Sequence, residues 1–428
     1  MKILKHTQVD FWEKLHIALA ARQGAHADVA PQVKAIIADV RQRGDAALRD
    51  YTAQFDFVTL GKNITLSTQE INDTAANCPE NVRQALELAA SRIRAFHAKQ
   101  QPASLDYTDE IGVGLGLQWT ALDSVGLYVP GGTANYPSSV LMNALPAVVA
   151  GVERIVMVVP TPRGALNPAV LYAAKLAGIT EIYPIGGAQA IAALAFGTET
   201  IKPVDKIMGP GNAFVAEAKR QVFGTVGIDS IAGPSEILVI ADNKNNPQWI
   251  AWDLLSQAEH DTDSQSVLIT DDAAFADKVI AALESILETL PRREIARSSW
   301  ENHGLVILVE NLAESVAISD VVAPEHVELC VDNPRDYLKK IRHAGSVFLG
   351  RHTPEAIGDY VGGANHVLPT CRAARFASGL SVYDFLKRTT YLECSADALQ
   401  VLGQPTVTLA EEEGLHAHAG SVAIRLKT

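Results

Sequence analysis

The chain has 428 residues, and its 36 Lys and Arg against 49 Asp and Glu give a formal net charge of −13 with His neutral. Hydrophobic residues make up 48% and charged residues 20%, which is typical of a soluble globular protein and excludes a disordered or fibrous chain. The acidic balance disfavours nucleic acid and acidic membranes as partners. The length predicts two or three packing units.

No segment of the sequence predicts a membrane span or a secretory signal. The longest apolar stretch, 144–152, contains Pro146 and Gly151 and is far shorter than the roughly 20 residues that a span needs. Asp10 and Glu13 precede any apolar region at the N-terminus, so we expect a cytoplasmic protein. The four cysteines form no C-x-x-C pair, which argues against a disulfide framework and leaves nitrogen and oxygen ligands for any metal.

The predicted elements change in character along the chain. Residues 1–110 are expected to form a helical segment that packs on the first unit, because apolar residues recur at helical spacing over 33–40 and no breaker interrupts 82–97. Short β-rich runs then alternate with helical segments. The expected strands are 124–129, 153–159, 181–185 and 204–208, and the expected helices include 138–150 and 188–196. This alternation indicates βαβ units on a mostly parallel sheet.

A second series of strands and helices follows. Its expected strands are 236–241, 266–269, 305–309 and 346–349, and its helices are 247–260 and 273–290. The fold class is therefore α/β, with two Rossmann-like doubly wound units. The expected divisions are a helical segment at 1–110, a first unit at 111–235, a second unit at 236–380 and a C-terminal arm at 381–428. The arm is expected to end in a strand-like run at 421–426.

Three glycine-rich loops, at 128–132, 185–189 and 208–212, follow predicted strands and open onto helices, and a fourth lies at 231–236. Ligands bind at the carboxyl ends of strands in such sheets, and glycines before a helix N-terminus suit phosphate groups. A simple turn explains any one loop as well, but three such loops in one unit favour a phosphate-bearing ligand. The G-x-G-x-x-G fingerprint is missing, because 112–116 has the wrong spacing. The pattern alone leaves a dinucleotide as one candidate.

Histidines, carboxylates and an amide form a candidate metal site. Gln257 and His260 lie three residues apart at the end of a predicted helix and therefore share a face. Later candidates are Asp359, His366, Glu413 and either His416 or His418. Such ligands suit zinc or a similar cation. Each histidine taken singly is more often a hydrogen-bonded polar group than a ligand, and spacing does not choose between the last two.

Glu325 and His326 follow Pro324, a residue favoured in the first turn of a helix. Adjacent helical residues diverge by about 100°, so the two side chains can touch different parts of one substrate and handle protons separately. The alternative is a solvated pair at a helix start, where Glu325 complements the helix dipole. Cys330 has no evident charged partner, so we expect a small buried side chain rather than a nucleophile.

Together these motifs resemble one family, the histidinol dehydrogenases, which complete histidine biosynthesis. The ordered motifs are YVPGG at Tyr128, GGAQAIAALAFGT at Gly186, GPGN at Gly209, IDSIAGPSEI at Ile228, LLSQAEHD at Leu254, APEHVEL at Ala323, GDYVGGANHVLPT at Gly358, ARFASGLSVYDFLKR at Ala374 and EGLHAH at Glu413. No single motif is unique to the family, but the ordered set is highly specific. Cys371 and Arg372 stand where smaller residues are also found.

The resemblance implies an NAD-dependent oxidation of L-histidinol through L-histidinaldehyde to L-histidine, which consumes two NAD⁺. It matches His326 to the general base that takes the alcohol proton, and Glu325 to the residue that activates water. One Zn²⁺ per subunit would bind Gln257, His260, Asp359 and His418. Ser235, His366 and Glu413 would hold the substrate together with the zinc ligands and His326, and Tyr128, Gln189 and Asn212 would lie along NAD.

The resemblance further implies a homodimer with shared active sites. The C-terminal arm of the family crosses over, so Glu413 and His418 would complete the site of the partner. NAD would lie on the 111–235 unit and zinc on the 236–380 unit. Three rival functions stay open. They are a paralogous NAD and zinc dehydrogenase of another small alcohol, a zinc hydrolase that works without NAD, and a metal-stabilised binding protein.

Overall fold

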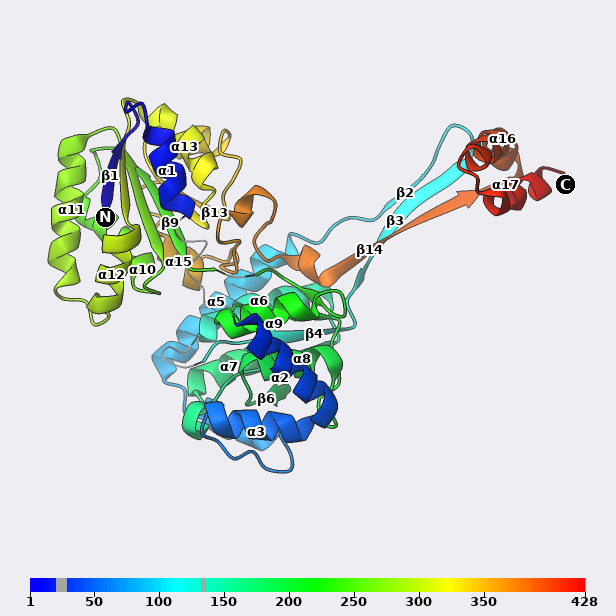
Figure 1. The fold of residues 1–428 in the computed structure, drawn as a ribbon, viewed down its shortest axis with the longest axis horizontal. Coiled ribbons are helices and arrows are strands. Elements are labelled where there is room, and N and C mark those ends of the chain that lie inside the picture. Colours follow the sequence, from blue (N-terminus) through cyan, green and yellow to red (C-terminus); the bar gives the residue numbers. More distant parts are fainter. Residues whose placement is uncertain (21–28, 132–135, 232, 428) are drawn as a thin grey trace.

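A computed structural model describes residues 1–20, 29–131, 136–231 and 233–427. The chain forms two α/β lobes and a projecting arm (Figure 1). Gly132 of the first glycine-rich loop lies outside the described residues. Within the described ranges, no helix is both long enough and apolar enough to span a membrane.

The first lobe is built on a parallel sheet of five strands in the order β6-β5-β4-β7-β8. The strands are β4 (Ser124–Tyr128), β5 (Arg154–Val158), β6 (Glu181–Tyr183), β7 (Lys206–Met208) and β8 (Gly227–Ile228). Its helices are α2 (Ala30–Arg43), α3 (Asp45–Phe55), α4 (Thr68–Ala76), α5 (Glu80–Ala98), α6 (Pro137–Ala150), α7 (Pro168–Ala177), α8 (Gly187–Phe196) and α9 (Ala213–Val222), with the short η1 (Pro162–Gly164). Two apolar clusters pack these helices against the sheet, as parallel sheets require.

The second lobe is built on a parallel sheet of six strands in the order β1-β11-β10-β9-β12-β13. The strands are β1 (Lys2–Lys5), β9 (Glu236–Ala241), β10 (Gln265–Thr270), β11 (Leu305–Leu308), β12 (His326–Cys330) and β13 (Ser346–Leu349). Its helices are α1 (Phe11–Ala20), α10 (Pro247–Ala258), α11 (Ala273–Leu287), α12 (Arg293–His303), α13 (Ser315–Val322), α14 (Pro334–Leu338) and α15 (Glu355–Tyr360), with the short η2 (Leu312–Glu314). Every pairing in this sheet is parallel.

The two parallel sheets confirm the α/β fold class. The start of the chain differs from expectation, because β1 pairs with β11 at the edge of the second sheet and α1 packs into the second lobe. Residues 1–20 therefore do not pack on the first unit, whereas α2 to α5 do. A four-residue edge strand is too short for a period-2 pattern to identify it, and its partner lies about 300 residues away.

The expected helix start after Pro324 is also wrong. Helix α13 ends where Ala323 adopts a left-handed backbone with φ 48°. The chain then runs directly into β12, which lies between β9 and β13 and is buried along its whole length. A proline suits a helix start, but a strand covered on both faces needs no alternating polar pattern and is easily missed.

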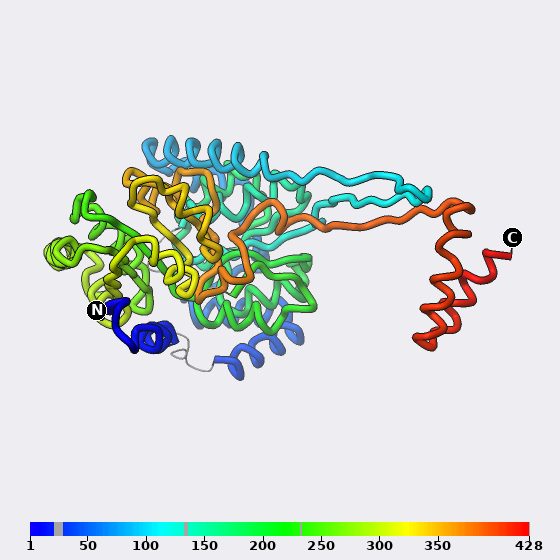
Figure 2. The backbone as a smooth tube through the Cα atoms, turned by 90° about the horizontal axis from the view of Figure 1, so that it is seen from above, coloured from blue at the N-terminus to red at the C-terminus, as the bar shows by residue number. Residues whose placement is uncertain are grey.

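The arm consists of an antiparallel ribbon that ends in two helices (Figures 1 and 2). Strand β14 (Leu386–Cys394) pairs with β3 (Val113–Ala121), and β3 pairs with β2 (Leu105–Thr108). Helices α16 (Ala396–Glu412) and α17 (His416–Ala423) lie at the far end, and the short helices η3 (Ala373–Arg375), η4 (Val382–Phe385) and η5 (Ile424–Lys427) complete the chain. The strand expected at 421–426 is wrong, because these residues belong to α17 and η5.

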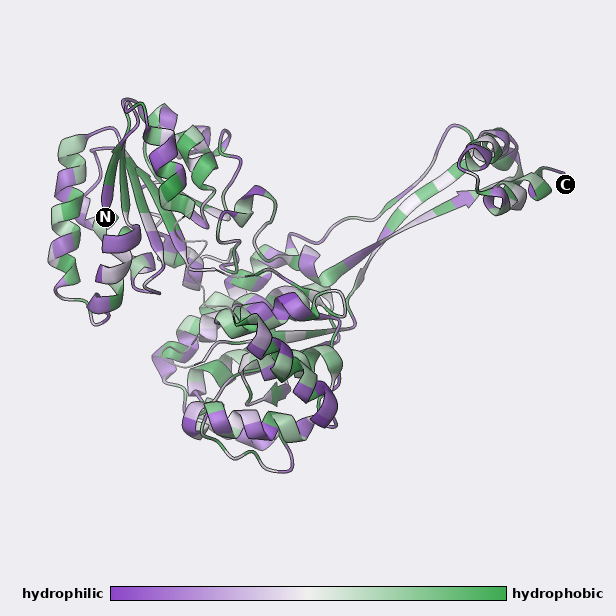
Figure 3. Cartoon of the chain, in the orientation of Figure 1, coloured by the Kyte–Doolittle hydropathy of each residue, from purple (hydrophilic) through white to green (hydrophobic). Residues whose placement is uncertain are grey.

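Figure 3 shows that hydrophobic residues occur along the arm, and several of them are exposed in the single chain. The exposed apolar side chains include Leu392, Val401, Leu409, Leu415 and Ile424. Several large apolar side chains exposed on one projecting segment are typical of an interaction site.

Candidate active site

A cavity of about 960 Å³ is lined by residues of both lobes. All but three of the predicted site residues line it: Tyr128 and Asn212 from the first lobe, and Ser235, Gln257, His260, Glu325, His326, Asp359 and His366 from the second half of the chain. The exceptions are Gln189, Glu413 and His418. Residues 210–212 of the third glycine-rich loop also line the cavity, as expected for loops at the carboxyl ends of parallel strands.

His326 is held in one tautomer by the neighbouring strand. Its Nδ1 lies 2.9 Å from the backbone carbonyl oxygen of Glu236, which can only accept, so Nδ1 carries the hydrogen. Its Nε2 has no hydrogen-bond partner among the described residues and lies 3.7 Å from a carboxylate oxygen of both Glu355 and Asp359. A buried imidazole nitrogen with a free lone pair is suited to act as a base.

The carboxyl of Glu325 is anchored at the same backbone position. Its Oε2 accepts the backbone N–H of Glu236 at 3.0 Å and lies 3.7 Å from Nδ1 of His326. Burial raises the pKa of Glu325 to about 7, and the nearby His326 opposes that rise. A carboxyl that titrates near neutral pH can both give and take a proton, as general acid–base chemistry requires.

Carboxylates that surround His326 also set its charge. Burial lowers the pKa of His326, but Glu325, Asp359 and Glu355 outweigh it and raise that pKa to about 10. A cation bound at Asp359 would offset this negative field. The neutral, basic form of His326 is therefore favoured when a cation is held at this end of the cavity.

The predicted metal ligands of the second lobe offer a suitable donor set. Gln257 is 1% exposed, and its Oε1 has no hydrogen-bond partner among the described residues. Burial alone would raise the pKa of Asp359, but His326 and His366 outweigh burial and lower that pKa below its usual value. The carboxylate therefore stays ionised. An orphaned amide oxygen, an ionised carboxylate and the nearby imidazole of His260 fit a divalent cation such as zinc.

Ser235 and His366 are fixed at the edge of the cavity. The Oγ of Ser235 lies 3.2 Å from Nδ1 of His260. The Nδ1 of His366 donates to the carbonyl oxygen of Asp359 at 2.8 Å, which leaves its Nε2 to accept from the Oγ of Ser139 at 3.3 Å. Both side chains therefore connect to the candidate metal ligands.

The three predicted cofactor residues differ in position. Asn212 lines the cavity and its side chain accepts the N–H groups of Phe214 and Val215, which caps the start of α9. The hydroxyl of Tyr128 accepts the N–H of Gly187 at 3.1 Å. Gln189 is buried in α8 and does not line the cavity.

Glu413 and His418 lie outside the cavity of their own chain. Both are exposed on the arm, Glu413 at the end of α16 and His418 in α17. Figures 1 and 2 both show these helices held away from the two lobes by the ribbon. Within one chain, the structure therefore brings together three of the predicted zinc ligands and leaves the fourth apart.

Glu355 is a site residue that the sequence does not reveal. It is 2% exposed and, with His326 and Asp359, offers ligand atoms that all lie within 4.8 Å of one another. Its Oε2 accepts from the Oγ of Ser256 at 3.1 Å, and its Oε1 has no hydrogen-bond partner among the described residues. The only trace in the sequence is its spacing four residues before Asp359, which places both on one face of α15.

Two buried charged side chains, Lys219 and Asp229, hold the start of the loop at 209–212 through hydrogen bonds to its backbone. The N–H of Gly209 donates to Oδ2 of Asp229 at 2.7 Å, and its carbonyl accepts from Nζ of Lys219 at 2.9 Å. Lys219 and Asp229 also form a buried ion pair. Gly209 has φ +109°, and a Cβ there would lie 2.1 Å from the carbonyl oxygen of Tyr128.

Gly209→Ala is therefore expected to push this loop away from β4. We expect a loss of about 1–3 kcal/mol in the free energy of unfolding and a rise of about fivefold or more in the KM for NAD, the coenzyme that the sequence resemblance implies. Gly224→Ala is the matched control, because Gly224 has φ +101° but nothing within 4 Å of the added Cβ. Denaturant titration and NAD saturation curves check this, and equal effects of both substitutions would contradict it.

Comparisons with known proteins identify the family of this chain. The histidinol dehydrogenase family model matches residues 19–426. Histidinol dehydrogenase 1 of a Nostoc species is 65% identical over 427 residues, which is 100% of this chain and 99% of that protein. The Rhodospirillum rubrum histidinol dehydrogenase is 59% identical and covers 99% of this chain and 98% of its own length.

A solved structure agrees with these relatives in fold. The crystal structure of histidinol dehydrogenase from Elizabethkingia anophelis superposes with a TM-score of 0.94 at 39% identity, over 100% of this chain and 98% of that one. The chain therefore belongs to the histidinol dehydrogenase family of NAD-dependent oxidoreductases, which act in histidine biosynthesis.

Proposed function

We propose that this chain oxidises L-histidinol to L-histidine in two hydride transfers to NAD⁺, within the cavity between its lobes. The observation that carries the proposal is the buried His326, whose Nδ1–H is fixed by Glu236 while its Nε2 is left free beside the candidate metal ligands. That arrangement supplies a base beside the residues that would hold the metal, where the hydroxyl of the substrate would present its proton.

Zinc would be held by Gln257, His260 and Asp359 of one chain and by the partner subunit's His418. When bound, the ion orients the substrate through nitrogen ligands and polarises its surroundings, which is the positioning role among the roles of catalytic metals. The donor set contains one carboxylate and three neutral groups, so the occupied site keeps a net charge of about +1. A neutral substrate amine is favoured there over an ammonium group.

The proton transfers divide between two residues. In the first oxidation Nε2 of His326 takes the hydroxyl proton of histidinol while the carbinol hydrogen leaves as hydride to NAD⁺, and histidinaldehyde results. In the second oxidation Glu325 takes a proton from water while the oxygen of that water adds to the aldehyde carbon, which gives the hydrate as its oxyanion. The oxyanion transfers its hydride to a second NAD⁺, and the carboxylic acid that results releases its proton to give histidine. Glu325 and His326 both line the cavity, so both can reach a substrate bound in it.

Substrate and coenzyme would contact residues on both sides of the cavity. Ser235, His366 and the partner subunit's Glu413 would hold histidinol, and Tyr128, Gln189 and Asn212 would lie along NAD. The loops lack the G-x-G-x-x-G fingerprint, so we expect NAD to bind loosely. Gln189 is the least direct of these contacts, since it does not line the cavity in this structure.

We infer that the active unit is a homodimer with exchanged arms. The exposed apolar side chains of the arm would be covered by a partner, and Glu413 and His418 do not line the cavity of their own chain. Docking the arm on a second copy satisfies both requirements at once. A C2 dimer makes the exchange reciprocal, so each of the two sites is completed by the other chain.

The test is a count of NADH formed by purified protein supplied with L-histidinol and NAD⁺. We expect two NADH for each histidinol consumed, loss of turnover after chelation, and recovery when zinc is restored. Chelation removes the ion that orients the amine and offsets the carboxylates around His326, which explains the expected loss. Turnover of an ester without NAD would favour a zinc hydrolase, and oxidation of another alcohol in place of histidinol would favour a paralogous dehydrogenase.

A further inference from the structure

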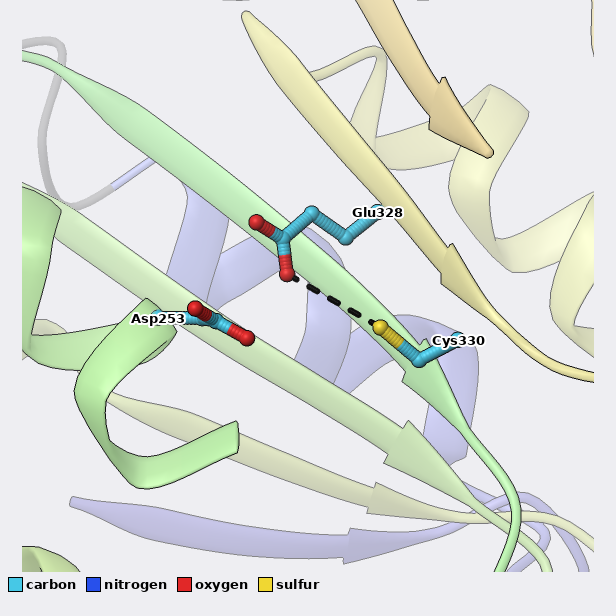
Figure 4. A group of neighbouring side chains, drawn as sticks. All are labelled: Asp253, Glu328 and Cys330. Carbon is cyan, nitrogen blue, oxygen red and sulfur yellow. Dashed lines mark hydrogen bonds between the residues drawn. The ribbon is translucent and has the colours of Figure 1, made fainter. Parts of the chain in front are cut away.

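A second cluster of ionisable side chains lies on β12 and α10, the elements that also carry His326 and Gln257. Asp253, Glu328 and Cys330 offer ligand atoms that all lie within 4.8 Å of one another (Figure 4). Glu328 and Cys330 lie on β12, and Asp253 faces them from α10. The proposed reaction uses none of the three.

The carboxyl of Glu328 accepts two hydrogen bonds. Glu328 is 1% exposed, its Oε1 accepts the backbone N–H of Glu355 at 2.6 Å, and its Oε2 accepts from the thiol of Cys330 at 3.9 Å. Within the described residues Glu328 forms no ion pair with Lys, Arg or His. Two carboxyls this close in a buried place cannot both be ionised, so Glu328 and Asp253 share a proton.

Burial supports this protonation state. It raises the pKa of Glu328 well above its usual value, and the neighbouring Asp253 raises it further. The pKa of Asp253 is raised to about 6, again by burial. Burial also raises the pKa of Cys330, so its thiol stays protonated. A hydrogen-bonded cluster in which two carboxyls share one proton is better suited to a structural role than to binding a cation.

Each element that meets in the cluster also carries an active-site residue. Strand β12 carries Glu328 two positions after His326, so both side chains point to the same face of the sheet. Helix α10 carries Asp253 one turn before Gln257. Helix α15 begins at Glu355, whose N–H is bound by Glu328, and carries Asp359 one turn later.

We propose that Glu328, braced by Asp253, is a positioning residue that fixes the N-terminus of α15 and thereby sets Asp359 and Glu355 against His326. The proposal rests on the zinc site of the proposed function. A six-residue helix has few packing contacts of its own, so one strong hydrogen bond at its first N–H decides where it sits. Displacing α15 moves one metal ligand relative to Gln257 and His260.

The test compares two substitutions of Glu328. Glu328→Gln keeps an oxygen for the Glu355 N–H and a donor for Asp253, so it reproduces the protonated carboxyl. Glu328→Leu has a similar volume and removes both functions. For zinc added to metal-free protein and followed by competition with a chromophoric chelator, we expect Leu to weaken binding about 10- to 100-fold and Gln by less than about threefold. At a fixed zinc concentration we expect kcat to fall in Glu328→Leu together with zinc binding, while the KM for NAD stays unchanged.

Cys330→Ala is the matched control, because it alters the cluster without touching the bond to α15. We expect parental zinc affinity and parental turnover. Parental zinc affinity in the folded Leu variant would overturn the proposal. Equal losses in the Gln and Leu variants, or a loss in Cys330→Ala, would also overturn it and would show that the cluster binds a cation itself. If the Leu variant does not fold, Asp253→Ala decides, since the proposal requires weaker zinc binding there too.

The failure of the proposed function is distinguishable from the failure of this inference. Parental protein that neither binds zinc nor oxidises histidinol would contradict the function alone. Hydrogen exchange of the α15 amides in metal-free protein then tests the brace directly. We expect faster exchange in Glu328→Leu than in parental protein and no change in Glu328→Gln, and equal protection in all three would overturn the inference.

Discussion

Co-expression of His326→Asn with His418→Asn is expected to restore about a quarter of the parental activity, although each variant alone loses nearly all of it. Random pairing makes half of the dimers mixed, and each mixed dimer has one site without a defect and one site with both. The expectation follows from the separation of the two residues, since His326 lines the cavity and His418 lies on the projecting arm. Differently tagged chains allow the mixed dimer to be purified and assayed.

Co-expression of His326→Asn with Gln257→Ala is the matched control. Both residues line the cavity of their own lobe, so every site in the mixed dimer carries a defect and no activity should return. Restoration in this control would show that the measured activity comes from another source. No restoration in the first pair would mean that each chain completes its own site, which would require the arm to fold back onto its own lobes.

Local patterns in the sequence predicted the elements that lie within one unit. The strands that were expected in the two βαβ series were predicted to within a few residues, because apolar runs between turn residues report burial directly, whereas β8 and β12 were missed. The loop at Gly209 and the helix before His260 were placed correctly for the same reason. These features depend on neighbours along the chain, which the sequence displays.

Long-range pairing was not predictable in the same way. Both Glu325 and His326 are held by the backbone of Glu236, about 90 residues earlier, through the contact of β9 with β12. The carboxyl of Glu355 reaches His326 only because α15 is seated next to that strand. No spacing rule connects such residues until the order of the strands is known.

The end of the chain shows how tertiary packing overrides a local pattern. The run at 421–426 alternates in polarity like a strand, yet it forms helical turns. The side chain of Leu426 lies so close to Gly403 of α16 that a Cβ there would be 2.5 Å from it. Packing of the last turn against α16 therefore decides the conformation, and period-2 alternation over six residues is a weak guide.

Substitution of the two proton-handling residues should separate the two oxidations. His326→Asn is expected to slow the oxidation of histidinol by about 10²- to 10⁴-fold, because it removes the only free imidazole nitrogen among the described residues beside Asp359 and Glu355. Asn keeps a hydrogen-bond donor for the carbonyl of Glu236, so the strand pairing is retained. Single-turnover assays with histidinol and with supplied histidinaldehyde measure the steps separately.

Glu325→Gln should show the opposite pattern. The amide cannot take a proton from water, so oxidation of histidinaldehyde should fall by about 10²- to 10⁴-fold while oxidation of histidinol changes much less. Gln keeps an oxygen for the N–H of Glu236, and it removes a buried carboxyl whose pKa near 7 shows that ionisation there is costly. The folded protein should therefore lose little stability. Equal damage to both oxidations from either substitution would contradict the division of roles and would indicate one shared base.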